Sequence, residues 1–193
     1  MYKKNPTIGI IAEDDSDVIC ARVFIHRITN NNKIKIKKWA KNGCSMMIRK
    51  CKSWANDLHN RGCSLLIVIH DSDGNNPNEI SKKINEQLSS CPIIKKVIVI
   101  PVQELEAWLL SDPDGIKKAL KLKRDLNVKS NTESIDSPKE YLGKAIDRAS
   151  NFEKIYTNTM HNEIISNIIS IDIIKKKCPS FVPFYSFITT NIK

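Results

Sequence analysis

The sequence predicts an α/β protein: a parallel four-stranded sheet flanked by helices, with a helical C-terminal extension. Three observations predict this fold. As far as Leu110, four short apolar runs alternate with amphipathic segments of helical period, which is the pattern of a parallel sheet with crossover helices. The length of 193 residues suits one domain with a substantial core. Hydrophobic residues make up 41% of the chain and charged residues 27%, which argues against intrinsic disorder.

The four predicted strands differ in polarity. Thr7 to Ala12 and Ser64 to His70 are almost wholly apolar, which is typical of strands buried on both faces. Because Ser64 to His70 is the most apolar run of the chain, we expect it near the centre of the sheet. Lys33 to Trp39 alternates charged and apolar residues, which indicates a strand near an edge. Lys96 to Pro101 is the fourth strand.

Helices are predicted between these strands and beyond them. Their expected ranges are Asp15 to Ile28, Ser45 to Asn60, Pro77 to Leu88, Val102 to Leu110, Lys139 to Ala149 and Ile164 to Lys176. The aromatic tail from Pro179 to Phe187 should pack back on the sheet. We therefore expect an α/β domain over residues 1–113 and a mainly helical extension, packed on it, over residues 114–193.

Composition narrows the classes of function. No apolar run approaches the ~18 residues that span a bilayer, and the run near the N-terminus is too short for a signal peptide. We therefore expect a cytoplasmic protein without membrane contact. The six cysteines form no CxxC pair, which argues against a zinc site and favours free thiols. A net charge of +10 favours a polyanionic partner, although the abundance of Lys, Ile and Asn indicates that part of the charge is compositional bias.

Acidic residues follow three of the four predicted strands. Glu13 and Asp17 come after the first strand, Asp71 and Asp73 after the third, and Glu106 after the fourth. In open parallel sheets, ligands bind beyond the carboxyl ends of the strands, where the strand order reverses. If the order is 2-1-3-4, the first and third strands are neighbours, and Glu13 converges with Asp71 and Asp73. These five acids are our candidate catalytic residues.

Such a cluster favours a divalent cation. Neighbouring carboxylates raise one another's pKa, and a bound cation relieves their repulsion. Mg²⁺ prefers oxygen ligands. In an extended segment Asp71 and Asp73 can face the same ion, and Gly74 permits the sharp turn that follows. We therefore expect Mg²⁺, or Mn²⁺, to be held by Glu13, Asp71 and Asp73.

Several of these residues also have a purely structural interpretation. Asp14, Asp15 and Asp17 begin a helix, where acids serve as N-caps and first-turn residues. Glu106 is either a fourth carboxylate of the site or a residue on the surface of its helix. His70 directly precedes Asp71 and is either a neighbour of the site or a packed residue at the end of a strand.

Three segments carry a resemblance to a known family. IIAEDDSD and LLIVIHDSDG resemble the TOPRIM fold of topoisomerases, DnaG-type primases and OLD-type nucleases, with Glu13 as its strand-end glutamate and Asp71 and Asp73 as its DxD. IPVQELEAWLLSDP is similar to an uncharacterised bacterial TOPRIM-like family in which ELEAWLL recurs. The resemblance spans Thr7 to about Pro113. It departs from the pattern at Asp14, where many relatives have Gly.

The resemblance implies a Rossmann-like sheet and magnesium-dependent cleavage of phosphodiester bonds in DNA or RNA. Glu13 or Asp17 would then orient or deprotonate a water molecule. The family also implies an ATPase partner protein and a role in antiviral defence against phages. It leaves the oligomeric state open.

The segment after Asp112 is basic. We expect Lys121, Lys123, Arg124 and Lys129 to contact the nucleic-acid backbone without reading bases. The alternative is a solvated lysine-rich surface.

Two other functions compete with a nuclease. The chain is either a non-catalytic TOPRIM-like partner subunit or, less well supported, a response-regulator receiver with Asp71 as phosphoacceptor. A receiver needs a later strand that ends in Lys, whereas this chain has KVIVIPVQELEAW there. Walker A loops, GxGxxG and serine-nucleophile motifs are absent, which argues against nucleotide hydrolysis.

Overall fold

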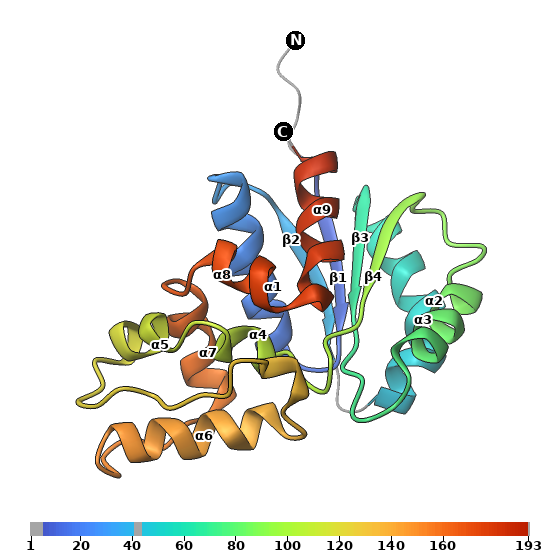
Figure 1. The fold of residues 1–193 in the computed structure, drawn as a ribbon. Coiled ribbons are helices and arrows are strands. Elements are labelled where there is room, and N and C mark those ends of the chain that lie inside the picture. Colours follow the sequence, from blue (N-terminus) through green and yellow to red (C-terminus); the bar gives the residue numbers. More distant parts are fainter. Residues whose placement is uncertain (1–5, 41–43, 193) are drawn as a thin grey trace.

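The computed structural model describes residues 6–40 and 44–192, without the side chains of residues 44 and 45. Its centre is a sheet of four parallel strands in the order β2-β1-β3-β4 (Figure 1). The strands are β1 (Ile8–Ala12), β2 (Ile36–Ala40), β3 (Leu65–Ile69) and β4 (Lys95–Val99). This confirms the predicted fold class, the edge position of β2 and the inner position of β3. β2 begins later than the expected Lys33.

Helices cover both faces of the sheet (Figure 1). α1 (Asp15–Thr29) and α9 (Val182–Asn191) pack on one face, and α2 (Cys44–Asn60) and α3 (Pro77–Gln87) on the other. Side chains of β1 alternate between the two cores: Ile10 packs with the α1 side and Ile11 with the α2 side. All residues of β1 and β3 are buried, as their apolar runs predicted.

Between β4 and α9 the chain forms further helices, most of which lie beside the carboxyl end of the sheet (Figure 1). They are α4 (Glu106–Leu110), α5 (Pro113–Leu120), α6 (Pro138–Ala149), α7 (Asn158–Ser166) and α8 (Ile171–Lys177), with short 3-10 helices at Thr132–Ser134 and Pro179–Phe181. Their apolar side chains belong to the same hydrophobic core as α1 and one face of the sheet. The extension therefore packs on the α/β part without a separate core of its own.

Two expected helices were wrong in extent. The helix expected over Val102 to Leu110 begins only at Glu106, because Gln103 has a left-handed φ of 61° and its N–H donates to Ser72 Oγ. The helix expected over Ile164 to Lys176 is divided into α7 and α8. Ser170 separates them, since its side chain accepts from Ile173 N as the N-cap of α8.

The aromatic tail packs back on the sheet domain, as predicted. Phe181 is fully buried, and its ring makes edge contacts with Phe24 of α1 and Trp108 of α4, with centroids 5.6 and 5.0 Å away. Trp108 Nε1 donates to Ser180 Oγ at 2.7 Å. These contacts make Trp108 a core residue and join α4, which carries Glu106, to α1 and the tail.

In the described part of the chain, no helix is long and apolar enough to cross a membrane. The five cysteines whose side chains are described are free thiols, as expected: Cys20, Cys51, Cys63, Cys91 and Cys178. The side chain of Cys44 lies outside the described residues.

Phe181→Ala should lower the free energy of unfolding by about 3–5 kcal/mol, because it removes a buried ring between three elements. Phe152→Ala is the matched control, since Phe152 is 74% exposed, and it should change stability by less than about 0.5 kcal/mol. Urea denaturation measures both. Equal stabilities of the two variants would contradict this role of the tail.

Candidate acidic site at the carboxyl end of the sheet

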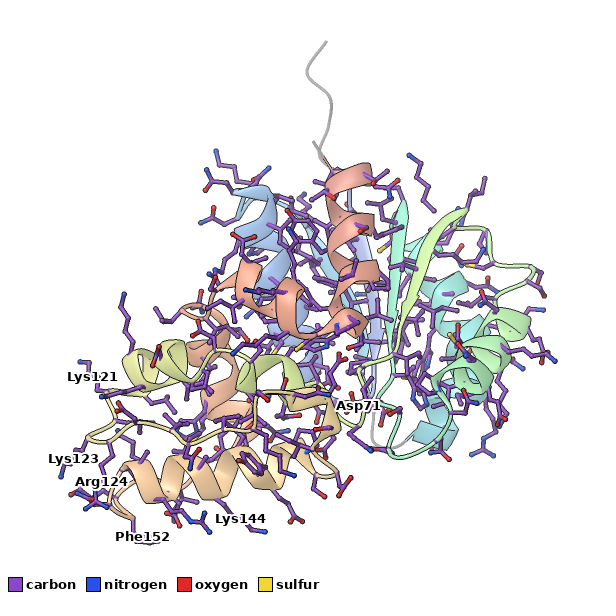
Figure 2. All side chains as sticks on the ribbon, in the orientation of Figure 1. Asp71, Lys121, Lys123, Arg124, Lys144 and Phe152 are labelled. Carbon is purple, nitrogen blue, oxygen red and sulfur yellow. The ribbon has the colours of Figure 1, made fainter. Side chains whose placement is uncertain are left out.

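The ends of β1 and β3 meet through Glu13 and Asp71. Asp71 N donates to Glu13 Oε1 at 3.0 Å, and Asp71 Oδ1 accepts from Leu105 N at 3.0 Å. Asp71 thus links the segments that follow three parallel strands. Figure 2 places it where the carboxyl end of the sheet meets the helical extension. The convergence of Glu13 and Asp71 expected from the strand order is confirmed.

Asp17 and Glu106 are two buried acids of this region, with 5% and 3% exposure. Asp17 lies in the first turn of α1, where it closes a capping box with Asp14. Asp14 Oδ1 accepts from Asp17 N, and Asp17 Oδ2 accepts from Asp14 N. Asp17 therefore caps the helix, as its structural interpretation predicts, and is also buried beside the other acids; its catalytic role stays a prediction.

The acids interact electrostatically as one group. Burial raises the pKa of Asp17 well above its ordinary value, and burial likewise raises that of Asp71. Negative charges nearby add to both shifts. Those acting on Asp17 belong to Asp14, Glu106 and Glu13; those acting on Asp71 belong to Asp17, Glu106, Glu13 and Asp73. We call Glu13, Asp17, Asp71 and Glu106 the acidic cluster.

Glu106 is fixed by two residues that the sequence did not indicate. Its Oε1 accepts from Asn162 Nδ2 at 3.1 Å and lies 3.1 Å from Tyr156 Oη, which is also 2.5 Å from Asn162 Oδ1. Burial, followed by the charge of Glu106, raises the pKa of Tyr156. These partners lie 50 and 56 residues further along the chain, and no spacing in the sequence connects them to Glu106. Glu106 is thus buried at the site, the first of its two expected alternatives.

Asp73 does not continue an extended segment, so that part of the expectation was wrong. It is exposed and adopts a left-handed φ of 45°, followed by Gly74 at 77°. Ser72 N and Asp73 N donate to Pro101 O and Gln103 O, so backbone pairing with the segment after β4 continues as far as this turn. Asp73 still adds to the raised pKa of Asp71. Its role as a metal ligand stays a prediction.

His70 is buried and contacts the acidic cluster. Its Nδ1 lies 3.2 Å from Glu13 Oε1 and 2.6 Å from Asp71 O. Its Nε2 is buried without a hydrogen-bond partner within the described part of the chain. His70 is therefore both a neighbour of the acidic cluster and a packed residue at the end of β3.

Other acids of the region have structural partners. Glu104 Oε2 accepts from Lys139 N at 2.7 Å, in the first turn of α6. Asp112 caps α5 through Gly115 N and also accepts from Ser170 N. Asp15 is exposed and pairs with Lys38 at 2.5 Å. Their positions are explained without a ligand.

The donor set fits a hard divalent cation, because the cluster offers carboxylate oxygens whose negative charges repel one another. Across residues 6–40 and 44–192, no three His, Cys, Asp or Glu side chains surround a common point as a formed metal site. Two cluster oxygens face backbone donors, Glu13 Oε1 at Asp71 N and Asp71 Oδ1 at Leu105 N. The metal set Glu13, Asp71 and Asp73 remains a prediction.

Three of the four predicted nucleic-acid contacts, Lys121, Lys123 and Arg124, lie away from the acidic cluster (Figure 2). Lys121, Lys123, Arg124 and Lys129 are exposed residues on the loop that follows α5. Figure 2 shows the first three at the end of the helical extension remote from Asp71. Lys123 forms an ion pair with Glu153. Any strand that touches both regions must therefore run along the extension.

The raised pKa values of Asp17 and Asp71 predict a pH dependence of stability. The folded protein keeps protons that the unfolded chain has released, so the free energy of unfolding falls as pH rises from about 4 through the raised folded pKa values. Asp17→Asn keeps an oxygen acceptor for Asp14 N and removes the charge. It should flatten this dependence and be more stable than the wild type at neutral pH.

Urea denaturation as a function of pH tests this, with Asp15→Asn as control because Asp15 is exposed and paired with Lys38. Parallel stability curves for the wild type and Asp17→Asn would contradict the account of the cluster.

Comparison with known proteins identifies a family and no function. Neither the curated proteins nor the solved structures contain a match to this chain. A family model described as a domain of unknown function, DUF4276, matches residues 16–189. This match runs from the first turn of α1 into α9 and includes the carboxyl ends of β3 and β4. Because it covers most of the sequence, the chain belongs to the DUF4276 family.

Proposed function

We propose that the protein is a TOPRIM-like, magnesium-dependent nuclease that hydrolyses phosphodiester bonds of DNA or RNA. One observation carries the proposal: carboxylates that follow three parallel strands interact at one edge of the sheet, where burial and mutual repulsion raise the pKa of Asp17 and Asp71. Repulsion among buried carboxylates lowers the stability of the folded protein when no ligand is bound, and such destabilising clusters are expected at functional sites. The proposal includes cytoplasmic location and an ATPase partner in antiviral defence.

The acidic residues would have different roles in the reaction. Glu13, Asp71 and Asp73 would hold Mg²⁺ or Mn²⁺, which when bound neutralises charge on the scissile phosphate. Burial raises the pKa of Asp17 well above its ordinary value, which suits a group that accepts a proton from water. Glu106 is anchored through Oε1 by Asn162 and Tyr156, which keeps its carboxylate at the site.

The competing functions have less support. A receiver needs a lysine after β4 to contact the phosphorylated aspartate, and the segment that reaches Asp71 from β4 instead presents Leu105 N and Glu106. A non-catalytic partner subunit does not require buried, mutually repelling acids. This subunit remains the alternative. Cleavage by the isolated chain in an activity assay would exclude it.

Asp71→Asn and Glu106→Gln should each lower divalent-dependent cleavage by about 100-fold or more, because changing even a neighbour of a metal ligand costs roughly 10- to 100-fold. Fluorescent single- and double-stranded DNA and RNA oligonucleotides, with Mg²⁺ or Mn²⁺, provide the assay. Asp15→Asn is the matched control, since it removes an exposed carboxylate of the same helix as Asp17, and it should keep full activity.

Full cleavage by the double variant Asp71→Asn, Asp73→Asn would reject this site. Absence of cleavage by the wild type, with either ion and any of the oligonucleotides, would favour the non-catalytic subunit.

A further inference from the structure

We propose that a basic pocket on the helical extension binds a backbone phosphate of a single-stranded nucleic acid, and that Phe152 stacks on an adjacent base. The pocket lies between residues 124–127 and α6. The inference rests on the proposed function, because it describes how the substrate strand is held away from the acidic cluster. It adds the residues of this pocket and Phe152 to the binding surface, and it specifies a single-stranded substrate, which the acidic cluster does not define.

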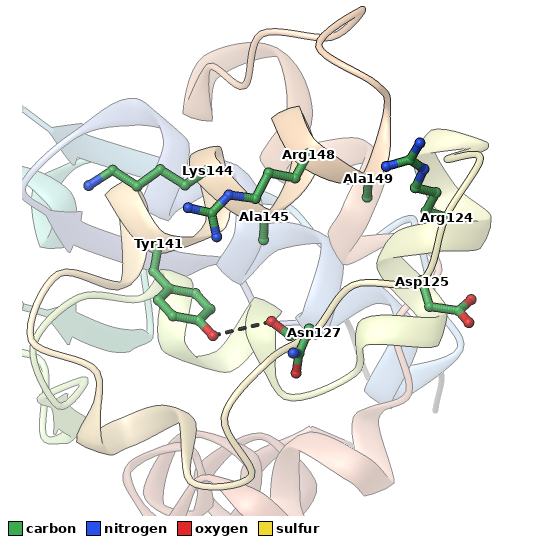
Figure 3. A pocket seen from close by; sticks show the side chains of 8 residues that line it. All are labelled: Arg124, Asp125, Asn127, Tyr141, Lys144, Ala145, Arg148 and Ala149. Atoms are coloured by element: carbon green, nitrogen blue, oxygen red, sulfur yellow. Dashed lines mark hydrogen bonds between the residues drawn. The ribbon is translucent and has the colours of Figure 1, made fainter.

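The pocket has the size and charge that a phosphate group needs. Its volume is about 320 Å³, and its walls carry the cations Arg124 and Arg148 (Figure 3). Lys144 also lines it, but its ammonium points away from the centre in Figure 3 and pairs with Glu140 at 3.4 Å. Tyr141 adds a hydroxyl group, and the acid of the wall, Asp125, points away from the centre in Figure 3. Asp125 is moreover paired with Lys117 at 2.5 Å. The pocket therefore keeps an excess of positive charge.

The two arginines of the pocket are available to a ligand. The guanidinium groups of Arg124 and Arg148 make no hydrogen bond or ion pair with any residue that the structure describes. Other arginines do: Arg22 pairs with Glu163, and Arg27 donates to two backbone carbonyls of the α7–α8 segment. A guanidinium presents paired N–H donors in the geometry of phosphate oxygens, so unpaired arginines in a pocket favour phosphate.

Hydrogen bonds hold the walls of the pocket in place before any ligand binds. Arg124 N donates to Ala149 O at 3.0 Å near the end of α6, and Tyr141 Oη donates to Asn127 O at 3.2 Å near its start (Figure 3). Between these bonds, Leu126 is buried in the core. A preformed pocket loses little conformational entropy on binding.

Phe152 gives the second, independent observation. It is 74% exposed, and it follows Asn151 in a left-handed conformation, with φ values of 58° and 62°. Aromatic residues rarely adopt positive φ, so this turn presents the ring to solvent at a conformational cost. The Lys123–Glu153 ion pair joins the neighbours of Arg124 and Phe152, and Figure 2 shows these two side chains at the same end of the extension.

An exposed ring beside a phosphate pocket is the arrangement by which proteins hold single strands. Unpaired bases stack on aromatic side chains while cations follow the phosphates. In a duplex the base faces are already stacked, so Phe152 would find no partner. Free phosphate would bind the arginines but would make no contact with the ring of Phe152.

Fluorescence anisotropy of a labelled 20-nucleotide oligothymidylate, with the full chain in EDTA, tests the inference without cleavage. Arg124→Gln with Arg148→Gln should raise Kd at least about tenfold and lower the slope of log Kd against log salt by about 0.7, since one phosphate neutralised on a single strand contributes roughly that much. Lys82→Gln with Lys83→Gln removes the same charge from exposed positions of α3, on the opposite face of the sheet, and should change Kd less than about twofold.

Phe152→Ala should weaken binding by about 5- to 100-fold, the range of one lost base stack, whereas Phe152→Trp should retain it. A duplex of equal length should bind more weakly than the single strand. Inorganic phosphate should compete only at far higher concentration than the oligonucleotide.

Equal Kd values for the arginine and lysine double variants, or wild-type binding by Phe152→Ala, would overturn the inference. So would inorganic phosphate that binds as tightly as the strand, which would make the pocket a site for free phosphate. Because binding is measured without divalent ions, the inference survives if the protein has no nuclease activity but binds the strand as expected. If the arginine variant cleaves normally and binds like the wild type, the inference fails while the proposed nuclease function survives.

Discussion

The parallel pairing of β1 and β3 is the constraint on which the site depends. It ends both strands at one edge of the sheet, so Glu13 comes within 3.0 Å of Asp71 N. Close packing on both faces maintains this register. At Gly9 of β1 a Cβ atom would lie 3.0 Å from Leu58 Cδ1 of α2, so only glycine lets this helix approach the strand without displacement. The acids meet because the strands beneath them are paired in this register and packed closely on both faces.

The helical extension completes the site. Asn162 of α7 and Tyr156 before it contact Glu106, and Asn158 Nδ2 donates to Asp14 Oδ2 and Ser16 Oγ at the start of α1. Phe181, near the C-terminus, packs on Trp108 of the helix that carries Glu106. Residues far apart in the chain thus fix the orientation of acids that follow the strands. The shared hydrophobic core of the extension and the sheet holds these residues in position.

The fold was largely predictable, because a strand buried on both faces must be apolar and such runs are local in sequence. Non-local contacts account for what was missed. The helix before Glu106 is absent because Gln103 N bonds Ser72 Oγ and Leu105 N bonds Asp71 Oδ1, pairings that no local pattern reveals. Five candidate acids were identifiable from their place after strands, whereas Tyr156 and Asn162 have no such signal. Arg148 and Lys144 resemble an ordinary solvated helix face until the loop with Arg124 lies opposite them.

A crystal structure with Mn²⁺ would decide whether Glu13, Asp71 and Asp73 hold the proposed divalent cation. Anomalous scattering at the manganese absorption edge locates the ion without assumptions about its ligands. We expect a peak at the carboxyl end of the sheet, in contact with carboxylate oxygens of Glu13, Asp71 and Asp73. An ordered manganese ion elsewhere, with no peak at these carboxylates at millimolar manganese, would contradict this expectation.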